Sequence, residues 1–257
     1  MRAVAACAAG LVLAACQSST PGNAAERHTH PASVATRTVE LRAADGVTVF
    51  GTFYPAPRPK AVILLFHQAG SSSGEYATIA PRLVEAGYSA LAIDQRSGGG
   101  LFGINRTARA FERKPQYLDA KPDLEAALAW AKGQGKPAIL WGSSYSAALV
   151  FLVAAEHPGE VTAVMAFSPG EYLGRDDMVR EAAAKVTAPI FVTSAKDSKE
   201  IAEARAILNG SAARTKVAFV PKKGGVHGSS TLIEAKNKTG ADENWEAVLG
   251  FLREVAP

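Results

Sequence analysis

The sequence predicts an α/β protein with a mostly parallel, twisted sheet and helices on both of its faces. Short unbroken apolar runs, such as residues 61–66, alternate with helical stretches, and such runs are typical of strands buried on both faces of a parallel sheet. The composition, with 47% hydrophobic and 20% charged residues, is typical of a compact globular domain. Residues 37–257 are enough for one domain with a sizeable core.

The expected elements follow from hydrophobic patterning in chain order. Residues 38–41 and 47–54 are parted by a turn carrying Asp45-Gly46 and predict an antiparallel hairpin. Beyond it we expect strands at 61–66, 89–93, 138–141, 161–167, 189–194 and 216–220, and helices at 74–85, 119–132, 145–157, 176–186, 200–208 and 242–255. Only residues 168–188 separate two of these strands at the place where a lid is often inserted, so no large cap domain is expected.

The first 36 residues differ from the rest. Residues 1–15 combine a cation at Arg2 with an apolar stretch and small residues, which is typical of an export signal, and the apolar part is too short to span a bilayer. Leu13-Ala14-Ala15-Cys16 resembles the lipobox of bacterial lipoproteins, in which the cysteine carries the lipid. The alternative is an ordinary cleaved signal with an incidental cysteine. Residues 16–36 are polar, lack periodicity and predict a flexible tether.

The lipobox resemblance implies an exported protein that is lipid-anchored to the bacterial cell envelope. Gln17, in place of aspartate, favours the outer membrane, with the domain facing the periplasm. Cys7 lies in the predicted signal, so the mature chain is expected to have no disulfide and no cysteine metal site. The net charge is +4 with scattered basic residues, so a nucleic-acid partner is not indicated. We expect no metal and no cofactor.

One stretch links a strand directly to a helix and carries the clearest chemical signal. In Gly142-Ser143-Ser144-Tyr145-Ser146, an apolar strand meets a sharp turn that opens onto an alanine-rich helix. Such a turn holds one serine in a strained conformation and exposes its hydroxyl. Gly142 and Ser146 are the small residues that must flank it, so Ser144 is predicted as a nucleophile. Two alternatives are a shifted register with Ser146 as nucleophile and a Ser/Gly loop without chemistry.

A serine nucleophile needs a histidine to accept its proton and a carboxylate to orient that histidine. His227 lies in a glycine-rich loop after the last expected strand and is predicted as the base. Asp197 follows the strand at 189–194 and is predicted as the acid, although it is also suited to cap the next helix. The other candidate acids are Asp176, Asp177 and, if Asp197 only caps, Glu200.

Acyl transfer also needs backbone N–H donors for the developing oxyanion. Tyr145 follows the nucleophile and is expected to supply one of them. The loop after the strand at 61–66 should supply the other, with Ala69 as the expected donor and Gln68 as the alternative.

With serine, acid and histidine in this chain order, residues 38–257 resemble the α/β-hydrolase superfamily, above all its dienelactone-hydrolase-like members and small serine esterases. His67-Gln68-Ala69-Gly70 is similar to the His-Gly-x-Gly oxyanion loop, and the stretch Asp94-Gln95-Arg96-Ser97-Gly98-Gly99 is similar to the Asp-x-Arg-Gly-x-Gly turn. Gln68 and Ser146 stand where the superfamily usually has glycine.

The expected function is a serine hydrolase that cleaves small carboxylic esters or thioesters through an acyl-enzyme. The alternatives are an amidase or peptidase with the same triad, and a lipoprotein that binds a ligand without catalysis. Without a cap, the site should be open and shaped by residues 168–173 and 101–117. The basic residues of the second segment either bind an anionic substrate or form a solvated basic face; they are Arg106, Arg109, Arg113 and Lys114.

Overall fold

An eight-stranded sheet in the order β1-β2-β4-β3-β5-β6-β7-β8 organises the chain. The computed structural model describes residues 1, 3, 34–111 and 113–257. Near one edge, β2 is antiparallel to both of its neighbours, β1 and β4, and the six strands from β4 to β8 in the sheet order are parallel to one another. The strands are β1 (Arg37–Arg42), β2 (Thr48–Tyr54), β3 (Val62–Phe66), β4 (Ser89–Ile93), β5 (Ala138–Ser143), β6 (Ala163–Phe167), β7 (Ile190–Thr193) and β8 (Lys216–Phe219). The predicted fold class is confirmed.

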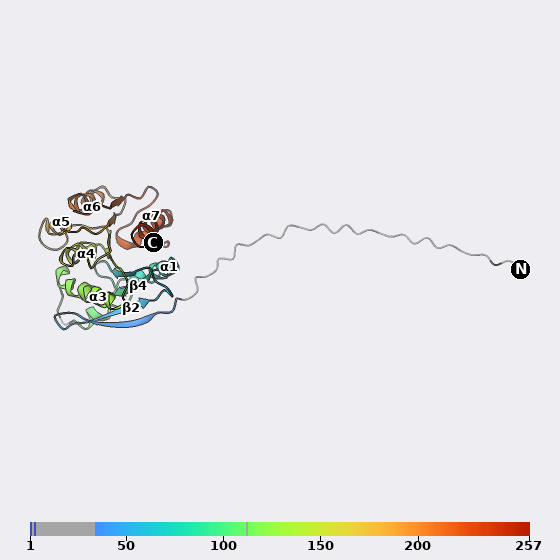
Figure 1. The fold of residues 1–257 in the computed structure, drawn as a ribbon, viewed down its shortest axis with the longest axis horizontal. Helices are drawn as coiled ribbons and strands as arrows, with labels where there is room; N and C mark the ends of the chain where they lie inside the picture. The colour runs from blue at the N-terminus through green and yellow to red at the C-terminus, as the bar shows by residue number, and fades with distance from the viewer. Residues whose placement is uncertain (2, 4–33, 112) are drawn as a thin grey trace. The chain divides into compact units, whose positions relative to one another are not determined.

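The helices cover both faces of the sheet (Figure 1). On one face, α3 (Lys121–Gly133), α4 (Tyr145–Glu156), α5 (Met178–Ala183) and α6 (Ser198–Gly210) pack on alternate residues of the strands. On the other face, α1 (Ile79–Glu85) and α7 (Ala241–Val255) pack on the remaining strand residues. Central strands such as β3 and β5 are therefore buried at every position, which is why they are continuous apolar runs in the sequence.

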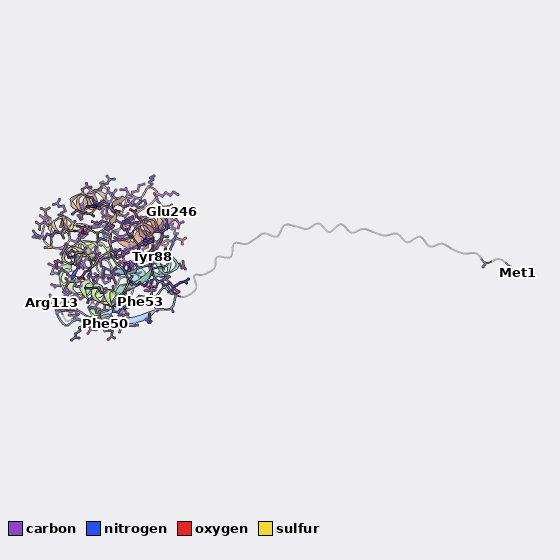
Figure 2. The ribbon with its side chains drawn as sticks, in the orientation of Figure 1. Met1, Phe50, Phe53, Tyr88, Arg113 and Glu246 are labelled. Atoms are coloured by element: carbon purple, nitrogen blue, oxygen red, sulfur yellow. The ribbon has the colours of Figure 1, made fainter. Side chains whose placement is uncertain are left out.

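Side chains fill the space on both sides of the sheet (Figure 2). On one side, Phe53 of β2 contacts Trp130 of α3 edge to face, with ring centroids 4.9 Å apart. On the other side, the hydroxyl of Tyr88 donates a hydrogen bond to the backbone oxygen of Ala256, just beyond α7. The second contact fixes the C-terminal end of the chain beside the start of β4.

Three helical segments differ from the prediction. The helix expected at 74–85 is divided into a short 3-10 helix, η1 (Ser73–Tyr76), and α1, and the side chain of Ser72 caps the first part. A second 3-10 helix, η2 (Tyr117–Ala120), precedes α3. The short helix α2 (Arg106–Arg109) lies in a segment for which no helix is expected from the sequence, and the side chain of Asn105 caps it.

A buried ion pair holds the turn after β4 in place. Arg96 donates to Asp123 of α3 through its side chain at 2.6 Å and also through its backbone N–H at 2.8 Å. Arg96 also bonds to Asp45 in the hairpin turn. The side chains of Arg96 and Asp123 are only 3% and 0% exposed, so the arginine of the Asp-x-Arg turn has a structural role.

Most of the predicted signal and most of the predicted tether fall on residues outside the described part of the chain. Cys16 and the lipobox-like residues lie outside the described residues. Among the helices of the described part, none has both the length and the apolar character to cross a membrane.

Candidate active site

The carboxyl ends of five neighbouring parallel strands meet at one edge of the sheet. In the order β3-β5-β6-β7-β8, the loop after β3 lies beside the turn after β5, and the loops after β7 and β8 follow. In open α/β sheets this edge is where sites form. It brings together the oxyanion loop, the serine turn and the segments that carry the candidate acid and base.

Ser144 is held in the strained turn that the sequence predicts. Its φ of 59° and ψ of −123° are unfavourable for any residue with a side chain. Its N–H donates to the backbone oxygen of Phe167 at 2.8 Å. A Cβ on Gly142 would lie 2.3 Å from the backbone oxygen of Ser146, so only glycine allows this close approach.

The alternative register, with Ser146 as nucleophile, is wrong. Ser146 is fully buried, and its hydroxyl donates to the backbone oxygen of His67 at 2.5 Å. It also accepts a hydrogen bond of 2.6 Å from the side-chain amide of Gln95. A hydroxyl with both of these partners is not available for attack on a substrate.

His227 lies directly against Ser144. The Nε2 atom of His227 is 2.8 Å from the Oγ atom of Ser144, and the Nδ1 atom is 2.8 Å from Oε1 of Glu200. Since a carboxylate can only accept, Nδ1 carries the proton and Nε2 of the neutral ring accepts from the serine hydroxyl. The structure thus brings together the predicted serine and histidine.

The predicted acid was wrong, because the carboxylate beside His227 belongs to Glu200. Asp197 is exposed and caps α6, accepting hydrogen bonds from the N–H groups of Lys199 and Glu200 at 3.0 and 3.1 Å. The two residues are three positions apart at the start of one helix. Asp197 therefore has the capping role that was its alternative interpretation.

Glu200 reaches the site because the first turn of α6 directs its side chain back toward the end of β7. Its second carboxylate oxygen accepts the N–H of Ala195 at 3.0 Å. The spacing Asp-x-x-Glu at a helix start is a signal for this arrangement, since a glutamate three residues after the cap often reaches back over the helix N-terminus. Asp177, another candidate acid, is at the N-cap of α5 and pairs with Arg180.

The contact between Glu200 and His227 shifts the pKa of both groups. Burial alone would raise the pKa of Glu200, but hydrogen bonds from His227, Ser168 and the N–H of Ala195 outweigh it and lower the pKa to about 2. In return, the hydrogen bond to Glu200 raises the pKa of His227 above its ordinary value of 6.5, against the opposing effect of burial. Glu200 is therefore ionised over the whole neutral range, and His227 is more basic than a free histidine.

The turn after β5 and the loop after β3 each offer one backbone N–H to an oxyanion. As the first residue of α4, Tyr145 has an N–H without a partner inside the helix. The N–H of Ala69 makes no hydrogen bond to any residue that the structure describes. The alternative donor, Gln68, is wrong, because its N–H donates to Oε2 of Glu75 at 2.8 Å.

A buried polar network fixes the oxyanion loop and explains Ser146. Nδ1 of His67 donates to the backbone oxygen of Gln68 at 2.8 Å, and Nε2 accepts the N–H of Gln95 at 3.0 Å. Complete burial lowers the pKa of His67 to about 4, so the ring is neutral. The side chain of Gln95 then bonds to Ser146 and to the hydroxyl of Tyr145. Ser146 thus connects the serine turn to the loop after β3.

The segments 101–117 and 168–173, which are expected to shape the site, contact the residue next to Ser144 or residues of their own segment. Tyr117 stacks on Tyr145 with ring centroids 4.5 Å apart, and Tyr172 donates to the backbone oxygen of Ser168 at 3.3 Å. The guanidinium of Arg106 lies 4.0 Å from the ring centre of Phe50, and Arg113 pairs with Asp119. Arg106 and Arg113 therefore have partners within the protein, which for these two favours the solvated basic face over a substrate-binding role.

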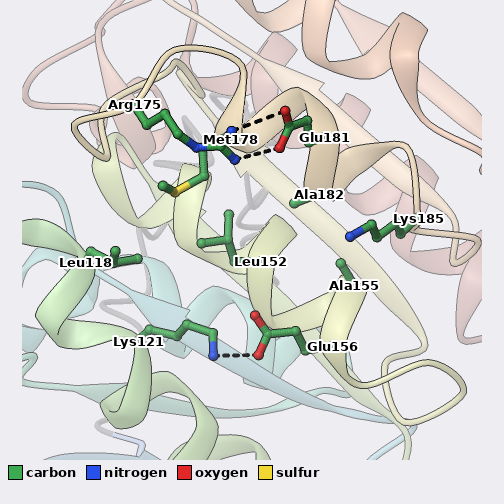
Figure 3. A pocket seen from close by; sticks show the side chains of 10 residues that line it. All are labelled: Leu118, Lys121, Leu152, Ala155, Glu156, Arg175, Met178, Glu181, Ala182 and Lys185. Atoms are coloured by element: carbon green, nitrogen blue, oxygen red, sulfur yellow. Dashed lines mark hydrogen bonds and ion pairs between the residues drawn. The ribbon is translucent and has the colours of Figure 1, made fainter.

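One hollow of the surface lies between helices, with no lining residue from the catalytic loops (Figure 3). It has a volume of about 440 Å³. Its walls hold the ion pairs Lys121–Glu156 and Arg175–Glu181 over an apolar floor that includes Leu152. Because Leu152 lies near the end of α4 opposite to Ser144, this hollow does not form part of the candidate site.

The contact between Glu200 and His227 predicts a change in the titration of the histidine ring. Glu200→Gln removes the charge that stabilises the protonated ring, so the pKa of His227 should fall and the ring should stay neutral to lower pH. NMR of the ring Cε1 proton measures this midpoint. Asp197→Asn is the matched control and should leave it unchanged. Equal midpoints in the wild type and Glu200→Gln would contradict the contact.

Solved structures with the same architecture include several hydrolases. The esterase Pf2001 of Pyrococcus furiosus has a TM-score of 0.68 and 17% identity, over 88% of this chain and 94% of its own. A dienelactone hydrolase from Anabaena variabilis has a TM-score of 0.67 and 17% identity, over 87% and 99%. A cold-adapted esterase from an Arctic intertidal metagenomic library has a TM-score of 0.65 and 20% identity, over 86% and 94%. At these identities the likeness shows the fold.

A family model identifies the chain more closely. The model described as serine aminopeptidase, S33, matches residues 57–206, which is more than half of the chain. A search of curated proteins found no match. The matched region runs from just before β3 into α6 and includes the serine turn with Ser144. The chain is therefore a serine hydrolase with the α/β-hydrolase fold, and it belongs to the serine aminopeptidase S33 family.

Proposed function

We propose that the chain is an esterase that cleaves small carboxylic esters or thioesters through an acyl-enzyme. Ser144 is the nucleophile, His227 the general base and Glu200 the acid that orients the histidine. The observation that carries this proposal is the continuous line of contacts from Ser144 Oγ through the ring of His227 to Glu200, with both distances at 2.8 Å. The strained backbone of Ser144 supports it, since strain of this kind is concentrated at functional sites.

Acylation follows from the protonation states. His227 Nε2 takes the proton of Ser144 as Oγ attacks the carbonyl carbon of the ester, and Glu200 stabilises the imidazolium that forms. The oxyanion receives hydrogen bonds from the N–H groups of Tyr145 and Ala69. When the bond to the alcohol or thiol breaks, the proton passes from His227 to that leaving group. Water, activated by the neutral ring, then hydrolyses the acyl-enzyme and regenerates the hydroxyl of Ser144.

The site favours an ester over an amino-terminal peptide. An aminopeptidase must hold a charged amino group, for which a free carboxylate is the natural partner. Two carboxylates beside Ser144 and His227 are engaged: Glu200 binds His227 and the N–H of Ala195, and Glu75 binds Gln68 and Ser143. The description of the family as serine aminopeptidases favours the peptidase alternative. Assays with p-nitrophenyl esters of graded length, beside aminoacyl p-nitroanilides, distinguish the two.

A ligand-binding lipoprotein without catalysis is the remaining alternative. Binding alone does not need a serine in a strained turn, nor a histidine whose pKa a carboxylate raises. Strain of this kind costs about 1–3 kcal/mol and persists only where the surroundings enforce it. The short segment between β6 and β7, which contains only α5, leaves the site without a large cap and suits small, accessible ester substrates.

Labelling with a fluorophosphonate probe tests the nucleophile. Wild-type protein should be labelled and should hydrolyse p-nitrophenyl esters, whereas Ser144→Ala should do neither because the attacking oxygen is gone. Ser146→Ala is the matched control in the same turn. It should be less stable, since it leaves buried partners without a hydrogen bond, and yet be labelled. Labelling of Ser144→Ala together with loss of labelling in Ser146→Ala would overturn the assignment.

Steady-state kinetics test the acid. Glu200→Ala should lower kcat by a factor of about 10³–10⁴ with little change in KM, because the histidine loses the group that orients it. Asp197→Ala should keep kcat within a few fold and lose about 1 kcal/mol of stability, as expected for a helix cap. The reverse pattern, with Asp197→Ala inactive and Glu200→Ala at full rate, would restore Asp197 as the acid.

We further propose that the protein is exported and anchored by a lipid at Cys16. The support comes from the sequence, in which a lipobox-like segment is followed directly by a polar stretch. Several acyl chains on one cysteine, at about 0.8 kcal/mol per buried CH₂, give a firm anchor where one chain does not. The domain would act on substrates in the periplasm, from the outer membrane.

Membrane fractionation tests the anchor. Wild-type protein should stay in the membrane fraction after a salt wash, since a hydrophobic anchor is not released by screening of charges. Cys16→Ser should instead be found in the soluble fraction or as unprocessed precursor in the inner membrane. Cys7→Ser serves as the control and should behave as the wild type. Cys16→Ser protein in the outer-membrane fraction would argue against lipidation.

A further inference from the structure

Glu75 is a buried carboxylate that the mechanism above does not use. It lies in η1 and is only 1% exposed. Within the described residues no lysine, arginine or histidine forms a salt bridge with it. Its oxygens instead accept the N–H of Gln68 at 2.8 Å and the hydroxyl of Ser143 at 2.7 Å.

The contacts of Glu75 link three segments of the site. Gln68 precedes Ala69 in the oxyanion loop, and Ser143 precedes the nucleophile. The Oγ atom of Ser143 also accepts the N–H of Ser229 at 2.9 Å, two residues after His227. One carboxylate therefore connects, directly or through one hydroxyl, the segments that carry the oxyanion donor, the nucleophile and the base.

The histidine loop packs closely against the hydroxyl of Ser143. A Cβ on Gly228, which has a φ of +66°, would lie 2.4 Å from the Oγ atom of Ser143, so the histidine loop touches this hydroxyl at a position where only glycine fits. A shift of Ser143 is therefore transmitted to the residue next to His227.

A buried carboxylate without a cation is costly, because it loses its hydration. Burial raises the pKa of Glu75 to about 7, although the hydrogen bonds from Gln68 and Ser143 and the charge of His227 act in the opposite direction. The titratable groups that face it are His227 across the site and Tyr76 on its own element. A glutamine in this place would avoid the cost of the charge.

We propose that Glu75 is a positioning residue for acyl transfer, whose carboxyl group holds the oxyanion loop, the end of β5 and the histidine loop in register. This inference rests on the proposed function. Both oxygens of a carboxylate accept, which matches the two donors that face them. An amide offers one acceptor and one donor, so either the N–H of Gln68 or the hydroxyl of Ser143 would face an NH₂ group.

Loss of either hydrogen bond to Glu75 should weaken the stabilisation of the transition state. Oxyanion donors work only when they lie about 2.7–3.1 Å from the position of the oxyanion, and a shift of Gln68 moves the neighbouring N–H of Ala69. Removal of the negative charge also lowers the pKa of His227, because Glu75 contributes to its rise. The effects expected are a loss in kcat and a displaced pH profile.

The test compares Glu75→Gln with Asp123→Asn in the full-length chain. Asp123 is also a buried carboxylate, but it bonds to Arg96 and makes no hydrogen bond to Gln68, Ser143 or Ser229. Glu75→Gln should lower kcat about tenfold or more with KM within a few fold, since removal of a whole oxyanion donor costs about 10²–10³. The acid limb of its kcat/KM profile should move to lower pH. Asp123→Asn should lower the melting temperature and keep kcat and the pH profile of the wild type.

Ser143→Ala provides a second measurement that does not depend on the folding of Glu75→Gln. It breaks the link to Ser229 and should also lower kcat, and the double variant should lose little more than the worse single variant, because both act through one connection. Glu75→Gln with only a lowered melting temperature, or Ser143→Ala with full kcat, would overturn the inference. Wild-type protein that neither turns over esters nor reacts with fluorophosphonate would contradict the proposed function instead.

Discussion

The close approach of two backbones at Gly142 is the constraint on which the site depends. Because this residue has no side chain, the first turn of α4 lies against the end of β5, with the backbone oxygen of Ser146 only 2.3 Å from where a Cβ would be. The contact forces Ser144 into a positive φ at a cost of about 1–3 kcal/mol. Helix burial on one side and the hydrogen bond to Phe167 on the other offset this cost. The reactive hydroxyl is therefore positioned by packing that has no chemistry of its own.

Around this turn, the polar groups that support the site are connected below the surface. His67, Gln95 and Ser146 exchange hydrogen bonds with each other and with backbone groups of the oxyanion loop. Ser146 replaces a glycine of the superfamily pattern, and its hydroxyl bonds to the side chain of Gln95 and to the backbone oxygen of His67. Inside a protein, such a network is stable only if every member has its partners. The departure from the usual turn thus has a local reason, namely a serine with two hydrogen-bond partners where glycine has none.

The sequence allowed much of the fold and part of the site to be predicted. Apolar runs identified the parallel strands, because a strand buried on both faces is apolar at every position. Ser144 and His227 both follow strands of the same sheet, and this was enough to place them at the same edge.

The acid was assigned to Asp197 because it stands nearer the end of β7. Both it and Glu200 lie in the first turn of one helix, and only the direction of the side chains separates a cap from a partner of His227. The donor role of Gln68 failed for a similar reason, since the direction in which a loop N–H points is not encoded in residue type. Glu75 belongs to no motif, and its role depends on contacts between residues far apart in the chain.

The helix that follows the nucleophile is buried almost all round, and every residue from 145 to 154 is buried. Glu200, by contrast, begins a helix with an exposed face, and the side chain of His227 is 41% exposed in a glycine-rich loop. Amide protons in α4 should therefore exchange with solvent only when the whole domain opens, while those of the histidine loop should exchange through small local fluctuations. The site joins a buried helix, which follows the nucleophile, to a partly exposed loop, which holds the base. Heating or mild denaturant should release the base from the nucleophile well before the sheet comes apart, so that activity disappears while most of the fold persists.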